Sequence, residues 1–513
     1  MKTSVHIKSL FNTISFIILF LGAGCEKDFE GDREAQALPE TFAVVDSVRR
    51  DSNNLLVTTV TAYWWGESKT GFIEGYEVST DNQQTWQFTK EQKGSFLLNL
   101  PLGVAKGELP IFIRAIDNIG QKDPTPARMV FPIKNSAPKI AFDFTSNKRP
   151  VKSFPVVKIA WTTTDVDGRN DIDRFDLYLN DATNGTYSIP GNTTDAIISD
   201  SVFTSSIRIE GIQTPGVFQP QCRVFTGSRT IPLSGLLNGI VYDAWNYFYL
   251  KAVDKTGNNS LIAKDSIWIK KPVSDLLIVN ALSSSSSVVF NFYTNRFKNI
   301  GGNLAVFDTL IGISTQFTKD ELYNDAVTQT RTFNLFNNII WLTDDANTLA
   351  TCQQNTTEFF NNGGRMFITA EISNEFPATS SVLSFTPVEA LVVPPPGGNI
   401  RMNINELMTP HESGSGWPIL KSTSIISNSR PFITFSGSSG LFSYDSLCRA
   451  NLINQTTLGT TAWNGPANVL SMRKRVATGK ADLIFCSLPL QRLNGNNNID
   501  SLFRKALLEE LEF

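Results

Sequence analysis

The sequence predicts two all-β sandwiches, residues 38–137 and 138–272, followed by an α/β domain with a mainly parallel sheet, residues 273–513. Up to residue 272 the chain consists of short β-type runs separated by turn residues, which is typical of antiparallel sandwiches. Beyond it the apolar runs become continuous and alternate with helix signals, which indicates strands buried on both faces. A length of 513 residues accommodates about three such domains.

The two predicted sandwiches share a repeated sequence. The segment RAIDNIG at 114–120 matches KAVDKTG at 251–257, and an aromatic-bearing strand precedes each copy. Earlier in each copy a tryptophan, Trp65 or Trp161, leads into another β-type run. This pattern resembles fibronectin type III and related immunoglobulin-like domains of bacterial surface proteins, although the first copy lacks the D-x-D-G element found at 165–168. The resemblance implies a fold and says little about function.

The third predicted domain combines buried strands with helices. Its continuous apolar runs are DLLIVNAL at 275–282, NIIWL at 338–342, RMFITA at 365–370 and DLIFCS at 482–487. The segment TTEFFNN at 356–362 is followed by two glycines, which is a helix C-cap signature. Residues 499–511 have the apolar spacing of a helix. In the order of its predicted strands and helices, this domain resembles the class I glutamine-amidotransferase-like fold, including its ThuA-like relatives.

That resemblance implies two catalytic positions, and neither is filled. Catalytic members of the fold carry a cysteine in a Gly-x-Cys-x-Gly turn after the third of these strands and a histidine after the fourth. Here the turn reads TAEIS at 369–373 and the later position reads CSLP at 486–489. Cys486 is interpreted as a core residue inside an apolar strand. The resemblance therefore implies a degenerate domain with no catalytic residues, so that a non-enzyme is favoured over an enzyme.

Four other residues of this domain are candidate ligand contacts. Asp344, Asp345 and Glu371 follow predicted strands at their carboxyl ends, where α/β folds place their ligands. His411 lies in a loop near Trp417 and is the one histidine outside the predicted signal peptide. The alternatives are helix-capping carboxylates for the three acids and a solvent-exposed loop residue for His411.

An acidic turn in the second sandwich is a candidate calcium site. Asp165, Asp167, Asp171 and Asp173 surround Gly168 within nine residues, and calcium takes several oxygen ligands from a compact loop. The spacing is not that of an EF-hand, because the glutamate at the twelfth position is absent. A hairpin turn with solvated acids is the alternative. Apart from calcium, no cofactor is predicted.

The N-terminus predicts export and a lipid anchor. Two lysines and no acids lead into an apolar run at 10–21, which has the length of a signal-peptide core and is short for a membrane span. The following residues up to Cys25 resemble the lipobox of bacterial lipoproteins, with residues 1–24 as the signal peptide. Leu21 lies four residues before the cysteine, and Gly22 takes the usual place of the leucine. An ordinary signal peptide is the alternative.

Residues 25–37 are predicted to form a lipidated acidic tether, and their acidic cluster resembles the surface-export signal of Bacteroidota lipoproteins. A generic polar linker is the alternative. The formal charge is −3 and the sequence has no run of basic residues, so no nucleic-acid-binding surface is predicted. Four further cysteines are far apart and lack C-x-x-C pairing, so buried free thiols are favoured over disulfides or zinc. They are Cys222, Cys352, Cys448 and Cys486.

These patterns favour a cell-envelope lipoprotein, anchored to the outer membrane through lipid on Cys25, with exposure on the cell surface as one alternative. The leading hypothesis is a non-catalytic binding or docking module for a glycan or protein, carried on a β-sandwich spacer. One alternative is a hydrolase that acts on glycans or peptides through carboxylates of the third domain. Another is a structural subunit of an outer-membrane transport or secretion complex.

Overall fold

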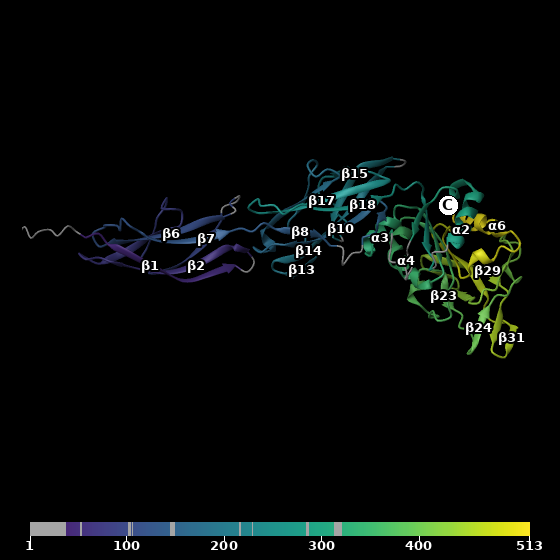
Figure 1. Ribbon diagram of the computed structural model, residues 1–513. Coiled ribbons are helices and arrows are strands. Elements are labelled where there is room, and N and C mark those ends of the chain that lie inside the picture. The colour runs from purple at the N-terminus through teal and green to yellow at the C-terminus, as the bar shows by residue number, and fades with distance from the viewer. Residues whose placement is uncertain are drawn as a thin grey trace, which may run out of the picture. The chain divides into compact units, whose positions relative to one another are not determined.

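A computed structural model describes most of the chain beyond the predicted anchor (Figure 1). The described residues are 37–51, 54–100, 104, 106–143, 149–214, 217–227, 229–283, 287–311 and 321–513. The predicted signal peptide, Cys25 and the tether up to residue 36 lie outside them. None of the described helices is long and apolar enough to cross a membrane. The described residues form two compact units, which meet in sequence between Lys134 and Asn135.

The first unit is a sandwich of two sheets. One sheet has the order β1 (Glu40–Asp51), β2 (Asn54–Glu67) and β5 (Lys93–Asn99). The other has the order β4 (Gln87–Thr89), β3 (Ile73–Ser79), β6 (Lys106–Asp117) and β7 (Ala127–Lys134). Trp64 of β2 packs edge-on against Tyr76 of β3, with 6.3 Å between ring centroids, and this contact joins the two sheets. Trp65 is exposed because successive side chains of a strand point to opposite faces.

The second unit begins with another sandwich. Its first sheet runs β16 (Leu237–Asn238), β15 (Val217–Thr226), β14 (Val202–Thr214), β10 (Val156–Thr164) and β8 (Lys139–Phe142), with β13 (Ala196–Ser199) beside β14. Its second sheet runs β12 (Tyr187–Pro190), β11 (Ile172–Leu179), β17 (Ala244–Asp254), β18 (Ala263–Ile269) and β9 (Lys152–Ser153). The rings of Trp161 of β10 and Phe175 of β11 meet between the sheets, with 5.1 Å between their centroids, so Trp161 lies in the core of this sandwich.

The rest of the second unit is built on one ten-stranded sheet. Its parallel half runs β20 (Asp308–Ile311), β19 (Leu276–Ala281), β21 (Asn338–Thr343), β22 (Arg365–Ala370) and β33 (Ala481–Cys486). Its antiparallel half continues with β32 (Asn468–Arg475), β29 (Phe442–Ala450), β25 (Leu407–Pro410) and β26 (Leu420–Lys421), and β28 (Ser438–Ser439) pairs with β29. The prediction of a mainly parallel sheet therefore describes one half of it.

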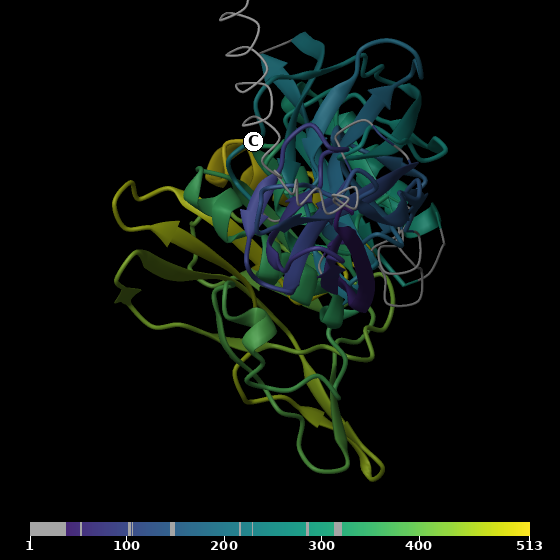
Figure 2. The same cartoon turned by 90° about the vertical axis from the view of Figure 1, so that its left-hand side faces the viewer.

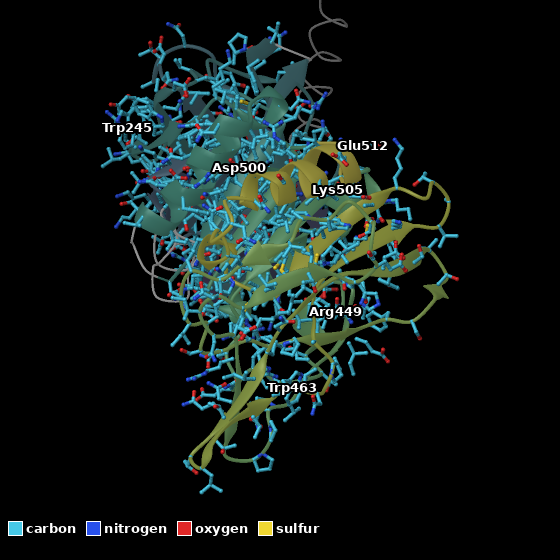
Figure 3. All side chains as sticks on the ribbon, turned by 90° about the vertical axis from the view of Figure 1, so that its right-hand side faces the viewer. Trp245, Arg449, Trp463, Asp500, Lys505 and Glu512 are labelled. Atoms are coloured by element: carbon cyan, nitrogen blue, oxygen red, sulfur yellow. The ribbon has the colours of Figure 1, made fainter. Side chains whose placement is uncertain are left out.

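Helices cover both faces of the parallel half. On one face lie α2 (Ser287–Ile300) and α6 (Ile499–Phe503), which continues as a π-helix, η6 (Arg504–Glu510). On the other lie α3 (Ala326–Phe333), α4 (Leu349–Asn355) and α5 (Thr357–Asn361). Asp500 of α6, labelled in Figure 3, pairs with Arg296 of α2 at 3.3 Å. Along β19, Leu276 and Ile278 enter one core and Leu277 and Val279 the other, which explains its continuous apolar run.

The long segment between β22 and β33 supplies the antiparallel half and two small sheets. These are β23 (Val388–Leu391) with β27 (Phe432–Thr434), and β24 (Gly398–Arg401) with β30 (Ile453–Thr456) and β31 (Gly459–Ala462). Figure 2 shows these green and yellow strands together. Short 3-10 helices occur at η1 (Arg169–Asp171), η2 (Gly302–Leu304), η3 (Ala346–Thr348), η4 (Ser381–Leu383) and η5 (Leu490–Arg492).

The second sandwich and the α/β region exchange core residues. Phe154, between β9 and β10 of the sandwich, is buried in the core of the α/β region, with its ring 5.0 Å from that of Phe336. Tyr323 of the α/β region is buried in the core of the sandwich. Lys270 and Glu321 add an ion pair at 3.1 Å across the same junction. These contacts explain why residues 135–513 form one compact unit.

Candidate functional site

Two predicted ligand contacts converge at the carboxyl edge of the parallel strands. Numbered along the chain, the five strands have the order 2-1-3-4-5, which places a switch point between β19 and β21. Asp344, directly after β21, accepts hydrogen bonds from the backbone N–H (2.5 Å) and the hydroxyl (2.7 Å) of Ser283, which follows β19. Glu371, directly after β22, donates its N–H to the carbonyl of Thr343 at 3.0 Å. The edge therefore brings two carboxylates to neighbouring strand ends.

Two charged groups act on Glu371 at this edge. Burial raises the pKa of the Glu371 carboxyl, the charge of Arg492 opposes the rise, and the charge of Asp344 adds to it. Arg492 lies in η5, after the carboxyl end of β33. Arg492 was not among the residues predicted from the sequence. The expectation that led to Asp344 and Glu371, that ligands bind at the carboxyl ends of parallel strands, applies equally to the segment after β33.

The segment that carries Arg492 is held by hydrogen bonds beneath the edge. The hydroxyl of Tyr293 in α2 donates to Oε1 of Gln491 at 2.6 Å. Thr369, the last but one residue of β22, donates its hydroxyl to the carbonyl of Leu488 at 2.9 Å. A site fixed in this way is organised before any ligand arrives, which reduces the ordering cost of binding.

The other two predicted contacts do not join this site. The Asp345 side chain accepts a hydrogen bond from the N–H of Asn347 at 2.9 Å and caps η3, which was the alternative assigned to it. His411 is exposed and follows β25, four strands from β22 in the sheet. At about 4.8 Å per strand that separation is roughly 19 Å. His411 and Glu371 therefore cannot act on the same small ligand.

The described cysteines do not supply a thiolate. Cys222, Cys352, Cys448 and Cys486 are all free and buried. Burial raises the pKa of the Cys222 and Cys486 thiols to about 12 and also raises the pKa of the other two. A thiol with so high a pKa is protonated at neutral pH and is a poor nucleophile.

The acidic turn of the second sandwich forms a different cluster from the one predicted. The carboxylate oxygens of Asp165, Asp167 and Asp171 lie within 4.8 Å of one another, and all three residues are buried. Asp173 is not part of this cluster. It lies one residue into β11, where side chains alternate between faces, and its 49% exposed side chain pairs with Arg174 at 2.9 Å.

Asp254, at the end of β17, is a further carboxylate that acts on this cluster and was not predicted from the sequence. It is buried, and its charge acts on both Asp165 and Asp171. Burial first, and then the neighbouring carboxylates, raise the pKa of Asp165 and of Asp171 to about 7. Asp254 is the aspartate of the repeated KAVDKTG segment. Nothing in the sequence indicates that it lies near the acidic turn.

Fold and site together define a protein with two β-sandwiches and an α/β region whose carboxylates gather at a sheet edge. No protein-family model and no curated protein matches the chain.

Solved structures to which the chain is similar include fibronectin(III)-like modules of CbhA from Clostridium thermocellum, 13% identical over 45% of this chain and 94% of that one, TM-score 0.16. The PKD1 domain of Epp from Vibrio anguillarum is 14% identical over 19% of this chain and 96% of that one, TM-score 0.13. A tetra-tandem repeat from the extending region of a large adhesion protein is 12% identical over 46% of this chain and 50% of that one, TM-score 0.19. TM-scores this low add nothing to the description of the fold given by the sheets themselves.

Proposed function

We propose that the chain is a lipid-anchored protein of the cell envelope, in which β-sandwiches act as a spacer and the α/β region is a non-catalytic binding module. The observation that carries the proposal is the edge formed by Asp344, Glu371 and Arg492. Ligands of open α/β sheets bind outside the carboxyl ends of the strands, at a switch point. This edge offers several acceptors and one cationic donor, which suits a hydroxyl-rich glycan or a polar peptide.

The absence of catalysis is supported by what surrounds the edge. The turn after β22 carries Glu371 where the resembling enzymes carry their cysteine. Cys486, in the strand that the histidine should follow, is buried and has a raised pKa. His411 lies four strands from β22. A cysteine or serine nucleophile with a histidine base cannot be assembled from these parts.

Retention and turnover can be measured together to test the binding module. Immobilised full chain is incubated with a panel of bacterial envelope polysaccharides, peptidoglycan fragments and unstructured peptides, and both bound and cleaved material are measured. We expect retention of one class without cleavage, and an affinity at least tenfold lower for Glu371→Gln. A hydrogen bond to a charged group contributes about 1.5–3 kcal/mol, and its loss corresponds to roughly that factor or more.

Glu375→Gln is the matched control, because Glu375 is exposed four residues further along the same segment. Its affinity should equal that of the wild type. Equal affinity for Glu371→Gln would contradict a site at this edge. Turnover that is abolished by a thiol-blocking reagent, or by His411→Ala, would contradict the absence of cysteine and histidine chemistry.

A carboxylate-dependent hydrolase is the second candidate, and the raised pKa of Glu371 favours it. Two carboxylates in unequal environments are the usual basis for an acid and a base in one site. Asp344 is held by two hydrogen bonds from Ser283, whereas Glu371 is partly buried beside it. Cleavage of a panel member that is abolished by both Glu371→Gln and Asp344→Asn would establish this function instead.

The anchor is tested by Cys25→Ser. We expect the variant to leave the membrane fraction, because the predicted lipid on Cys25 would be the attachment and one acyl chain contributes about 0.8 kcal/mol per buried methylene. Metabolic labelling with a fatty-acid analogue, followed by fractionation, measures both consequences. Label or membrane association that persists in the variant would show that the anchor lies elsewhere.

A further inference from the structure

Asp254 is one of four buried carboxylates near the acidic turn, with Asp165, Asp167 and Asp171, and the first unit shows its structural role. Asp117 occupies the same place in the repeated segment as Asp254. Its Oδ1 accepts hydrogen bonds from the N–H groups two and four residues further on, at 3.1 and 2.8 Å. Oδ1 of Asp254 makes the same pair at 2.9 and 2.8 Å. One oxygen of Asp254 therefore closes a turn, and its other oxygen, Oδ2, remains for the cluster.

In the acidic turn, Oδ1 of Asp165 accepts the N–H of Asp167 at 2.9 Å, but other oxygens of the cluster have no such partner. Oδ2 of Asp165 and Oδ2 of Asp171 are buried and lack a hydrogen-bond partner among the described residues. Oδ1 of Asn135 is buried and unpartnered as well, while the amide nitrogen of Asn135 reaches Oδ2 of Asp254 at 2.5 Å. Within the described ranges, none of the four aspartates forms an ion pair with Lys or Arg. Buried carboxylates without an ion-pair partner are strongly unfavourable. Burial and the charges of Asp254 and Asp167 raise the pKa of Asp171 more than the charge of Lys255 lowers it, so this end of the sandwich is short of positive charge.

We propose that these groups form a Ca²⁺ site in which Asp165, Asp167, Asp171 and Asp254 are the carboxylate ligands and Oδ1 of Asn135 is a further ligand. Ca²⁺ takes six to eight oxygens at about 2.4 Å, so ligands on opposite sides of the ion lie about 4.8 Å apart. The first three carboxylates meet that limit. The set contains oxygen only, which favours Ca²⁺ over zinc, whose structural sites are built from cysteine and histidine. Mg²⁺ usually takes one or two carboxylates and keeps its waters, which does not fit four.

The position of the site gives the ion a structural consequence. Asn135 and Ser136 lie between β7 and β8, where the chain enters the second unit. The N–H of Ser136 donates to Oδ2 of Asp167 at 2.5 Å, and Asn135 contacts Asp254. Both contacts depend on side chains that repel one another without a cation. Bound Ca²⁺ therefore holds the entry segment, and its removal releases that segment.

Calorimetry on the full chain, purified in detergent and stripped with a chelator, tests the site directly. We expect one equivalent of Ca²⁺ to bind, a higher unfolding temperature with Ca²⁺, and at least tenfold weaker binding of Mg²⁺. Asp171→Asn should weaken Ca²⁺ binding at least tenfold. Without metal the same variant should unfold at a higher temperature than the wild type, because it removes one repelling charge. A merely structural carboxylate would give the opposite sign.

Asp173→Asn is the matched control, since Asp173 is two residues away and lies outside the cluster. It should bind Ca²⁺ as the wild type does. The absence of saturable Ca²⁺ binding by the wild type would overturn the proposal. So would equal losses in the two variants, or a metal-free Asp171→Asn chain that is less stable than the metal-free wild type.

The entry segment provides a second readout that does not depend on affinity. Lys134 is exposed and immediately precedes Asn135, so endoproteinase Lys-C can cut between them. We expect this cut to be at least tenfold slower with Ca²⁺ than with chelator, with the fragment beginning at Asn135 identified by mass spectrometry. Cleavage after Lys90 should not respond. Equal rates at the Lys134 bond with and without Ca²⁺ would contradict the proposed consequence.

Discussion

Arg430→Met is expected to lower the free energy of unfolding of the second unit by about 3–5 kcal/mol. Arg430 is 1% exposed. Its guanidinium donates hydrogen bonds to the carbonyls of Ser373, Asn374, Phe376 and Val392, at 2.9, 2.7, 3.3 and 3.1 Å. Methionine fills a similar volume but removes the donor from the carbonyls of Asn374, Phe376 and Val392, whereas the carbonyl of Ser373 keeps the N–H of Phe376 at 3.2 Å. Each unsatisfied buried acceptor costs about 1–3 kcal/mol, partly recovered by relaxation.

The same substitution should also perturb the structure of the candidate binding edge. Three of the four carbonyls belong to the segment that directly follows Glu371, so Arg430 determines the course of that segment. Burial lowers the pKa of Arg430, and no described Asp or Glu forms an ion pair with it. The fixed fork of the guanidinium therefore matters more than charge pairing, and Arg430→Lys should recover less than half of the loss.

Denaturant unfolding followed by circular dichroism measures both variants. Arg449→Met is the control, because Arg449 is an exposed arginine on β29, labelled in Figure 3. Its substitution should change the free energy of unfolding by less than about 0.5 kcal/mol. If Arg430→Met behaved like Arg449→Met, the carbonyl network would have no stabilising role.

The sequence predicted those parts of the fold that depend on local pattern. The run at 275–282 is apolar at every buried position because helices cover both faces of its strand, and this pattern is visible without a structure. Segment 371–480 was not predicted as half of the main sheet. Its β29 has mostly half-buried side chains, so it lacks both the continuous run of a buried strand and clean alternation.

The site residues also divide into those that local sequence pattern predicts and those that it does not. Asp344 and Glu371 could be selected because the ends of parallel strands must meet at one edge, whichever strands lie between. Asp254 and Asn135 could not be assigned to the acidic turn, because each is tens of residues distant from it and only the paired sheets bring them together. The burial of Arg430 could not be predicted from the sequence, because arginine is usually a surface residue.

Phe154→Ala is expected to destabilise the full chain by about 3–5 kcal/mol, the usual cost of removing a buried phenylalanine ring. Phe154 belongs in sequence to the second sandwich but packs in the core of the α/β region, against Phe336. Nζ of Lys270 also lies 4.4 Å from the centroid of its ring. In Phe154→Ala these partners lose their contacts, so the cost should appear only where the α/β region is present.

A fragment of residues 38–272 separates the two contributions. From the sequence we expect this fragment to unfold cooperatively by itself, because each sandwich can bury its own core. Without the α/β region the ring of Phe154 is uncovered, so Phe154→Ala should cost the fragment less than about 0.5 kcal/mol.

Val151→Ala, at a 58% exposed position three residues earlier, should be nearly neutral in both chains. The difference between the full chain and the fragment is then the coupling energy of the junction. Equal costs of Phe154→Ala in the two would mean that Phe154 stabilises the sandwich itself. A fragment without a cooperative transition would mean that the second sandwich needs the α/β region, and with it Tyr323, to fold at all.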